Sequence, residues 1–75
     1  MKTDNKADAV YIYLSEKPYA RGRDLDDNRR IDYSDDGTPI GVELLNVSQG
    51  VDISDLPKQR EIGKILEGLG LRIFA

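Results

Sequence analysis

The segment RRIDYSDDGTPIGVELL, residues 29–45, decides the fold, because its pattern predicts a β-hairpin. The dipeptide Asp36-Gly37 is typical of a two-residue hairpin loop, in which both central residues take positive φ angles. Such a loop places Ile31 opposite Val42, and directly opposed residues share one face of a sheet. The rest of the chain can be arranged around this hairpin.

The two faces of the hairpin differ in polarity. In the predicted register Tyr33 lies opposite Ile40, and Arg30 lies opposite Glu43. A shift by one residue would mix apolar and polar side chains on each face, so the pattern itself supports the pairing. The core face is expected to carry Ile31, Tyr33, Ile40, Val42 and Leu44, and the outer face Arg30, Asp32, Gly41 and Glu43.

Length and composition restrict the class of protein. Residues 1–75 are expected to form one small domain, which buries only about 60% of its unfolded surface. With no metal or disulfide evident, self-association is a reasonable source of extra burial. There is no cysteine, and therefore no disulfide, zinc–thiolate site or cysteine nucleophile. The longest apolar run, Ala9–Leu14, is far too short to span a membrane. We therefore expect a cytoplasmic protein without a membrane segment.

The charged residues argue against catalysis. Asp and Glu number 14 against 11 Lys and Arg, which disfavours non-specific binding to nucleic acid. Histidine is absent, and with it the commonest general base and metal ligand near neutral pH. The acidic pairs lie at predicted turns, where solvent keeps carboxylates near their ordinary behaviour. We expect no enzyme, no catalytic residue and no cofactor.

The spacing of the acidic residues in the hairpin also resembles that of a calcium-binding loop. Asp32, Ser34, Asp36 and Glu43 fit a relaxed EF-hand pattern, which binds calcium between two helices. Both flanks here have strand character, and the hairpin register carries Glu43 away from the tip. The pattern is interpreted as an ordinary turn with no metal site, the alternative being a weak, millimolar-range ion at Asp35 and Asp36.

Two more strands are predicted before the hairpin. Ala9–Leu14 alternates aliphatic residues, assigned to the core, with Tyr11 and Tyr13, assigned to the outer face. Tyr19–Leu25 is a weaker strand that reaches the hairpin through a turn with Asp27-Asn28 at its centre. That turn would pair Arg23 with Asp32 and place Arg21 and Arg23 outward. Met1–Thr3 is expected to be at most a stub of strand.

The C-terminal part predicts a helix over about residues 55–68. Ser54 or Asp55 is a suitable N-cap, and Pro57 is tolerated in the first turn. One helical stripe contains Leu56, Ile62, Ile65, Leu66 and Leu69, with Gly63 beside it. Leu71–Phe74 is expected to form a short final strand or a clamp. The predicted class is α+β, an antiparallel β-meander of about four strands over residues 9–45 with one C-terminal helix packed on one face.

The outer face is the candidate binding surface. Interleaved tyrosine and arginine is typical of protein interfaces and also of sheets that stack nucleobases. The plain alternative is a solvated face with weak cross-strand ion pairs, Arg23–Asp32 and Arg30–Glu43. The residues assigned to the binding surface are Tyr11, Tyr13, Arg21, Arg23 and Arg30.

Several short motifs together resemble a known prokaryotic family. They are Ala7-Asp8-Ala9, Tyr11-Ile12-Tyr13-Leu14, Ile31-Asp32-Tyr33, Asp36-Gly37 and Gly41-Val42-Glu43. In this combination the chain resembles the family called domain of unknown function 2283. The resemblance implies a small β-rich fold with a helix, and it implies no activity and no catalytic residues.

These observations lead to two hypotheses about function. The first is a non-enzymatic protein-interaction or regulatory module that binds a protein partner or itself, most simply as a homodimer. The alternative is a nucleic-acid-binding module that uses the tyrosine and arginine residues of the outer face.

Overall fold

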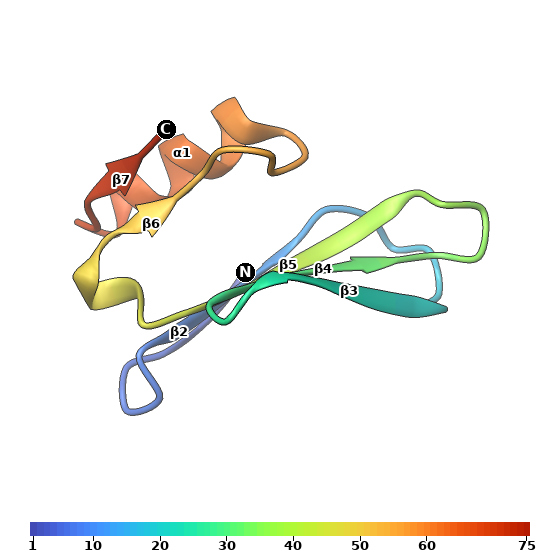
Figure 1. Cartoon of the computed structure of the whole chain (residues 1–75), viewed down its shortest axis with the longest axis horizontal. Coiled ribbons are helices and arrows are strands. Elements are labelled where there is room, and N and C mark those ends of the chain that lie inside the picture. The colour runs from blue at the N-terminus through green and yellow to red at the C-terminus, as the bar shows by residue number, and fades with distance from the viewer.

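The computed structural model describes all residues, 1–75, and consists of two layers (Figure 1). The first layer is a five-stranded antiparallel sheet, and the second contains the helix α1 and a two-stranded parallel sheet. This arrangement confirms the α+β class with one C-terminal helix. The elements are β1 (Lys2–Asp4), β2 (Ala9–Tyr13), β3 (Arg21–Asp26), β4 (Arg29–Tyr33), β5 (Pro39–Leu45), the 3-10 helix η1 (Val47–Gln49), β6 (Val51–Asp52), α1 (Gln59–Gly68) and β7 (Ile73–Phe74).

The strand order of the large sheet is β1-β2-β5-β4-β3. The strands β3, β4 and β5 follow one another as hairpins, as in a meander, but β2 lies beside β5 and not beside β3. Four strands thus have a Greek-key order. The connection from β2 to β3 crosses the far end of the sheet, where Leu14 N–H donates to Ile40 O (2.8 Å) and Ala20 N–H donates to Tyr33 O (2.9 Å).

The β4–β5 hairpin has the predicted register but a different loop. Ile31 lies opposite Val42, as predicted from the sequence. The loop has three residues, because Ser34 N–H donates to Thr38 O (2.9 Å) and Gly37 N–H donates to Ser34 O (3.0 Å). Gly37 has φ +85°, which fits a type I turn followed by a left-handed glycine.

A β-bulge compensates for the longer loop. Tyr33 lies opposite Pro39, not Ile40, and Asp32 lies opposite Gly41, so that Ile40 is the extra residue. The added loop residue and the bulge cancel, which is why the predicted register holds beyond them. Ile40 is 8% exposed, but it lines a hollow on the outer face and is not part of the core cluster, contrary to its predicted place.

The predicted register of β3 is wrong by one residue. The two-residue turn at Asp27-Asn28 is present, but a bulge precedes it in β3, between Asp24 and Asp26. Arg21 therefore lies opposite Tyr33, and Arg23 lies opposite Ile31. Both arginines are on the core side of the sheet, where they are exposed at its edge, and not on the outer face.

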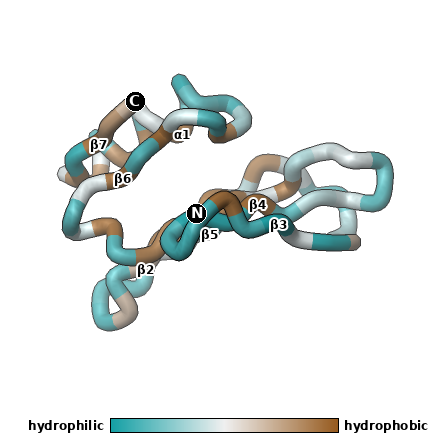
Figure 2. Tube along the Cα trace, in the orientation of Figure 1, coloured by the Kyte–Doolittle hydropathy of each residue, from teal (hydrophilic) through white to brown (hydrophobic).

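The core lies between the two layers and contains 11 residues. Val10 and Ile12 of β2 face it, as predicted, while Tyr11 and Tyr13 point outward. Figure 2 shows that the hydrophobic stretches lie within the strands and α1, whereas the turns at the sheet's ends are mostly hydrophilic. The core cluster consists of Val10, Ile12, Ile31, Val42, Leu44, Val47, Val51, Ile53, Leu56, Ile62 and Leu66.

The helix α1 begins later than predicted. It starts at Gln59 because Asp55 (φ +64°) and Lys58 (φ +50°) adopt left-handed conformations that interrupt any earlier helical turn. Ser54 caps no helix, and its hydroxyl donates to Asp52 instead (2.6 Å). Leu69 is 39% exposed, so it does not complete the predicted apolar stripe.

The final apolar segment forms a strand, as expected from the sequence. β7 pairs in parallel with β6, and Val51 lies opposite Ile73. Together β6, α1 and β7 make up the C-terminal layer. No helix has the length and apolar character needed to cross a lipid bilayer.

Replacing Gly63 by alanine should stabilise the protein. A Cβ atom at this buried helical position would lie 3.4 Å from Ile53 Cδ1 and 3.5 Å from Ile73 Cδ1, both ordinary contacts. Alanine is favoured over glycine within a helix by about 0.5–1 kcal/mol. Urea unfolding of G63A should show a higher midpoint. The control G70A should show a lower one, because Gly70 has φ +78°, and a lower midpoint for G63A would contradict the expected fit.

Candidate interaction surface

The outer face of the sheet is covered by no other element, because the C-terminal layer lies on the opposite side (Figure 1). A shallow hollow of about 520 Å³ opens on this face, which we call the tyrosine hollow. Three tyrosine rings, one isoleucine and several charged side chains line it. Its lining residues are Lys2, Asp4, Ala9, Val10, Tyr11, Tyr13, Tyr19, Asp32, Ile40 and Glu43.

A network of polar contacts fixes the side chains beside the hollow. Tyr11 Oη donates to Asp32 Oδ2 (2.7 Å), and Arg30 Nε donates to Asp32 Oδ1 (3.3 Å). The Arg30 guanidinium also donates to Asp24 Oδ1 (3.1 Å) and to Tyr19 Oη (3.3 Å). Burial, together with the nearby Asp32 carboxylate, raises the pKa of Tyr11 well above its ordinary value, so its hydroxyl stays protonated.

Two glycines make room for this network. A Cβ atom on Gly41 would overlap the Tyr11 ring, and a Cβ atom on Gly22 would overlap the Arg30 guanidinium. The Tyr11 ring and the Arg30 guanidinium can therefore lie flat against the strands. The sequence pattern places Gly22 on the core face beside Tyr33, but the shifted register of β3 puts it on the outer face, where it makes room for Arg30.

The structure brings together part of the predicted binding surface. Tyr11, Tyr13 and Arg30 share the outer face, and the rings of Tyr11 and Tyr13 are 5.0 Å apart between centroids. Arg21 and Arg23 lie on the other side of the sheet because of the bulge in β3. The expected composite of two tyrosines and three arginines is therefore not assembled.

The expected ion pairs across this face are also absent. Arg30 turns away from Glu43, its cross-strand neighbour, toward Asp24 and Asp32. Arg23 does not reach Asp32, since β3 is displaced by one residue. Glu43 is consequently left without an ion pair or a hydrogen bond at the hollow.

Sequence reasoning did not place Tyr19 or Lys2 on this surface. Tyr19 follows Pro18 in a loop, where no periodicity indicates which way a side chain points, and it is 57% exposed beside the hollow. Lys2 lies on β1 opposite Tyr11. Residues 2–4 were the only sequence signal for this edge strand, and three residues are too few to predict which side chain lies on which face of the sheet.

The acidic hairpin tip is held by local hydrogen bonds. Asp36 accepts bonds from Lys17 Nζ (2.6 Å), from Thr38 N–H (3.0 Å) and from the Ser34 hydroxyl. These donors, Lys17 first, hold the pKa of Asp36 well below its ordinary value. Asp32 and Glu43 belong to the outer face, and no group of three or more acidic side chains gathers around a common point.

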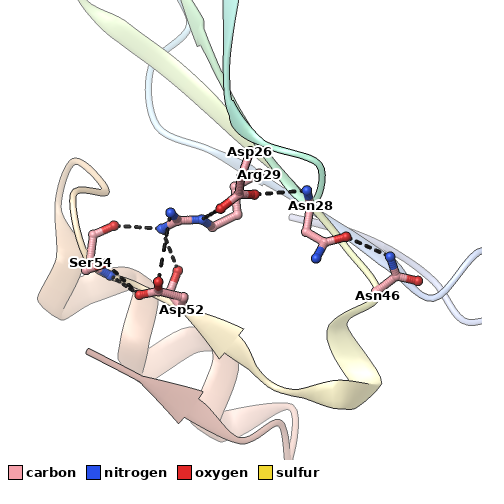
Figure 3. A network of polar contacts seen from close by, with 6 residues as sticks. All are labelled: Asp26, Asn28, Arg29, Asn46, Asp52 and Ser54. Carbon is pink, nitrogen blue, oxygen red and sulfur yellow. Dashed lines mark hydrogen bonds and ion pairs between the residues drawn. The ribbon is translucent and has the colours of Figure 1, made fainter.

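A second polar network, around Arg29, joins the two layers (Figure 3). Arg29 Nε donates to Asp26 Oδ2 (2.9 Å), while Nη1 donates to the backbone carbonyls of Asp52 (2.9 Å) and Ser54 (2.7 Å). Its side chain is only 10% exposed. The network links the start of β4 to β6 and to the segment that leads from β6 toward α1, so its role is structural.

The fold and this surface define a small α+β protein whose antiparallel sheet is covered on one face and open on the other. The family described as protein of unknown function (DUF2283) matches residues 2–48, and the chain belongs to this family. The matched segment contains all five strands of the large sheet and ends within η1. No curated protein and no solved structure matches the chain.

Proposed function

We propose that this chain is a non-enzymatic, cytosolic protein-interaction module that self-associates, and that the outer face of its sheet is the contact surface. The observation that carries the proposal is the pair of exposed aromatic rings at the tyrosine hollow. Tyr13 is 61% exposed and Tyr19 is 57% exposed. Tyrosine is among the residues most enriched at the energetic centres of protein interfaces.

The fixed geometry of the face supports the same proposal. Association costs the free energy of ordering mobile side chains, about 0.5–1.5 kcal/mol for each one immobilised. Tyr11, Asp32 and Arg30 are already held by mutual hydrogen bonds. A partner would therefore meet a surface on which these three side chains are already fixed, and on which two exposed rings, Tyr13 and Tyr19, lie beside the hollow.

The titratable groups favour a non-enzymatic role. The pKa values of Asp26, Asp36 and Asp52 are lowered by neighbouring donors, chiefly Asn28 N–H for Asp26, Lys17 for Asp36 and Ser54 for Asp52. These carboxylates remain ionised and hydrogen-bonded, whereas an acid–base pair needs pKa values that environment drives apart near the working pH. The raised pKa of Tyr11 keeps its hydroxyl protonated, so no phenolate is present near neutral pH to act as a general base.

The nucleic-acid alternative receives less support. It requires Arg21 and Arg23 beside the tyrosines, and both lie on the other side of the sheet. Arg30 remains, but its guanidinium is already shared by two carboxylates. Phosphate binding depends on a concentrated positive field, which this face does not provide.

Sedimentation equilibrium over about 10 µM to 1 mM tests the proposal. The wild-type chain should show concentration-dependent association, and Y13A should weaken it at least fivefold because an exposed ring at the centre of the contact is lost. L69A, which removes an exposed apolar side chain from the other layer, is the matched control and should associate as the wild type does. A wild-type chain that stays monomeric throughout this range contradicts the proposal.

A further inference from the structure

The strand register aligns five residues in one row across the outer face. Lys2 lies opposite Tyr11, Tyr11 opposite Glu43, Glu43 opposite Arg30, and Arg30 opposite Asp24. Directly opposed residues share a face, so the row reads cation, tyrosine, anion, cation, anion from β1 to β3. Two of these charges satisfy each other, because Arg30 Nη1 lies 3.1 Å from Asp24 Oδ1.

The other two charges of the row have no partner within the chain. Neither Lys2 nor Glu43 takes part in an ion pair or a side-chain hydrogen bond, and both line the tyrosine hollow. They lie one strand away from β2 on opposite sides, with Tyr11 between them. Since neighbouring strands are about 4.8 Å apart, the two charged positions are roughly 10 Å from each other.

This arrangement is self-complementary about one particular twofold axis. An axis parallel to the strands and above β2 would place a second copy face to face, with its Glu43 over Lys2 and its Tyr11 over Tyr11. Twofold contacts of this kind bring each pair together twice. An axis along the row itself would instead set Lys2 against Lys2 and Glu43 against Glu43, which is repulsive.

We propose that the tyrosine hollow binds a second copy of this chain, with Lys2 of each copy paired with Glu43 of the other. This inference rests on the proposed function and specifies its partner and its register. The Tyr11 and Tyr13 rings of β2 occupy the centre of the contact, Tyr11 half-buried and Tyr13 exposed, and the two ion pairs flank them. Two sheets packed in this way lie about 10 Å apart with strands inclined by about 30°.

The same geometry sets the strength of the association. An axis above β2 overlaps β1, β2 and β5 of the two copies, and β3 and β4 remain outside the contact. Three short strands cover less than the area of a standard interface, about 800 Å² on each partner. The dimer is therefore weak and forms at high micromolar concentration or above.

Charge exchange tests the pairing directly. K2E and E43K should each weaken self-association about tenfold, because each homodimer then contains two like-charged pairs. A mixture of K2E with E43K should regain association near the wild-type level, since both pairs in the mixed dimer have opposite charges. The double variant K2E/E43K should also associate, and K64E on the exposed side of α1 is the matched control that should behave as the wild type does.

Sedimentation equilibrium and matching circular dichroism spectra of all variants supply the readout. If the wild type associates but the single variants associate equally well, or if the mixture is no stronger than its components, the Lys2–Glu43 pairing is overturned while self-association stands. If the wild type is monomeric at 1 mM, the proposed function fails first and this inference fails with it.

Discussion

A chain that ends at Gly50 should be unfolded, although it contains all five strands of the large sheet. Five of the 11 core residues come after this point, namely Val51, Ile53, Leu56, Ile62 and Leu66. Burying side chains of this kind contributes about 1.5–3 kcal/mol each. Their sum, roughly 7–15 kcal/mol, equals or exceeds the total stability of about 4–11 kcal/mol expected for a domain of this length.

The measurement is thermal unfolding of residues 1–50 followed by circular dichroism and by the dispersion of amide resonances. We expect no cooperative transition and collapsed amide dispersion. A synthetic peptide of residues 51–75 added in trans should restore both signals, which shows that the missing core surface is responsible. A cooperative melt of residues 1–50 alone would show that the segment matched by the family folds independently.

The sequence predicted those parts of the fold in which periodicity alone decides the outcome. Val10, Ile12, Ile31 and Val42 face the core because strict alternation leaves one solution for each strand. The register of β3 was missed because one bulge residue, which no turn motif signals, reverses every side chain beyond it. The register of the β4–β5 hairpin was predicted correctly only because its longer loop and its bulge cancel each other.

The start of α1 and the side chains at the tyrosine hollow could be predicted only in part, because they depend on contacts that are distant in sequence. Ser54 and Asp55 are good capping residues by type, yet Asp55 and Lys58 take left-handed conformations that depend on the packing around Leu56. Tyr11 and Tyr13 were placed correctly from alternation. The direction of the Arg30 side chain could not be predicted, because it depends on the space that Gly22 leaves on the neighbouring strand and on a hydrogen bond to Tyr19, which lies in a loop.

R29A should lower the free energy of unfolding by about 2–3 kcal/mol, the cost of leaving several acceptors at a largely buried site without their donor. Asp26 and Asp52 are about half exposed and can turn to water, whereas the backbone carbonyls of Asp52 and Ser54 are fixed by the chain. For a domain of this size the loss corresponds to a fall in Tm of roughly 10–20 °C. R23A, at an exposed position on the edge of the same sheet, is the control and should change stability by less than about 0.5 kcal/mol.

The pH dependence of the R29A effect identifies which contacts matter. The lowered pKa of Asp26 means that any stability gained from its ionisation is present above its ordinary pKa and disappears as pH falls through the lower value in the folded state. The pKa of Asp52 is lowered as well, chiefly by Ser54. The two carbonyl acceptors do not titrate, so the part of the Arg29 effect that depends on them is the same at pH 7 and at a pH low enough to protonate both carboxylates. If the difference between wild type and R29A persists once Asp26 and Asp52 are protonated, the carbonyl bonds hold the C-terminal layer to β4. If it vanishes there, the ion pairs carry the effect, and Arg29 acts through Asp26 and Asp52 instead.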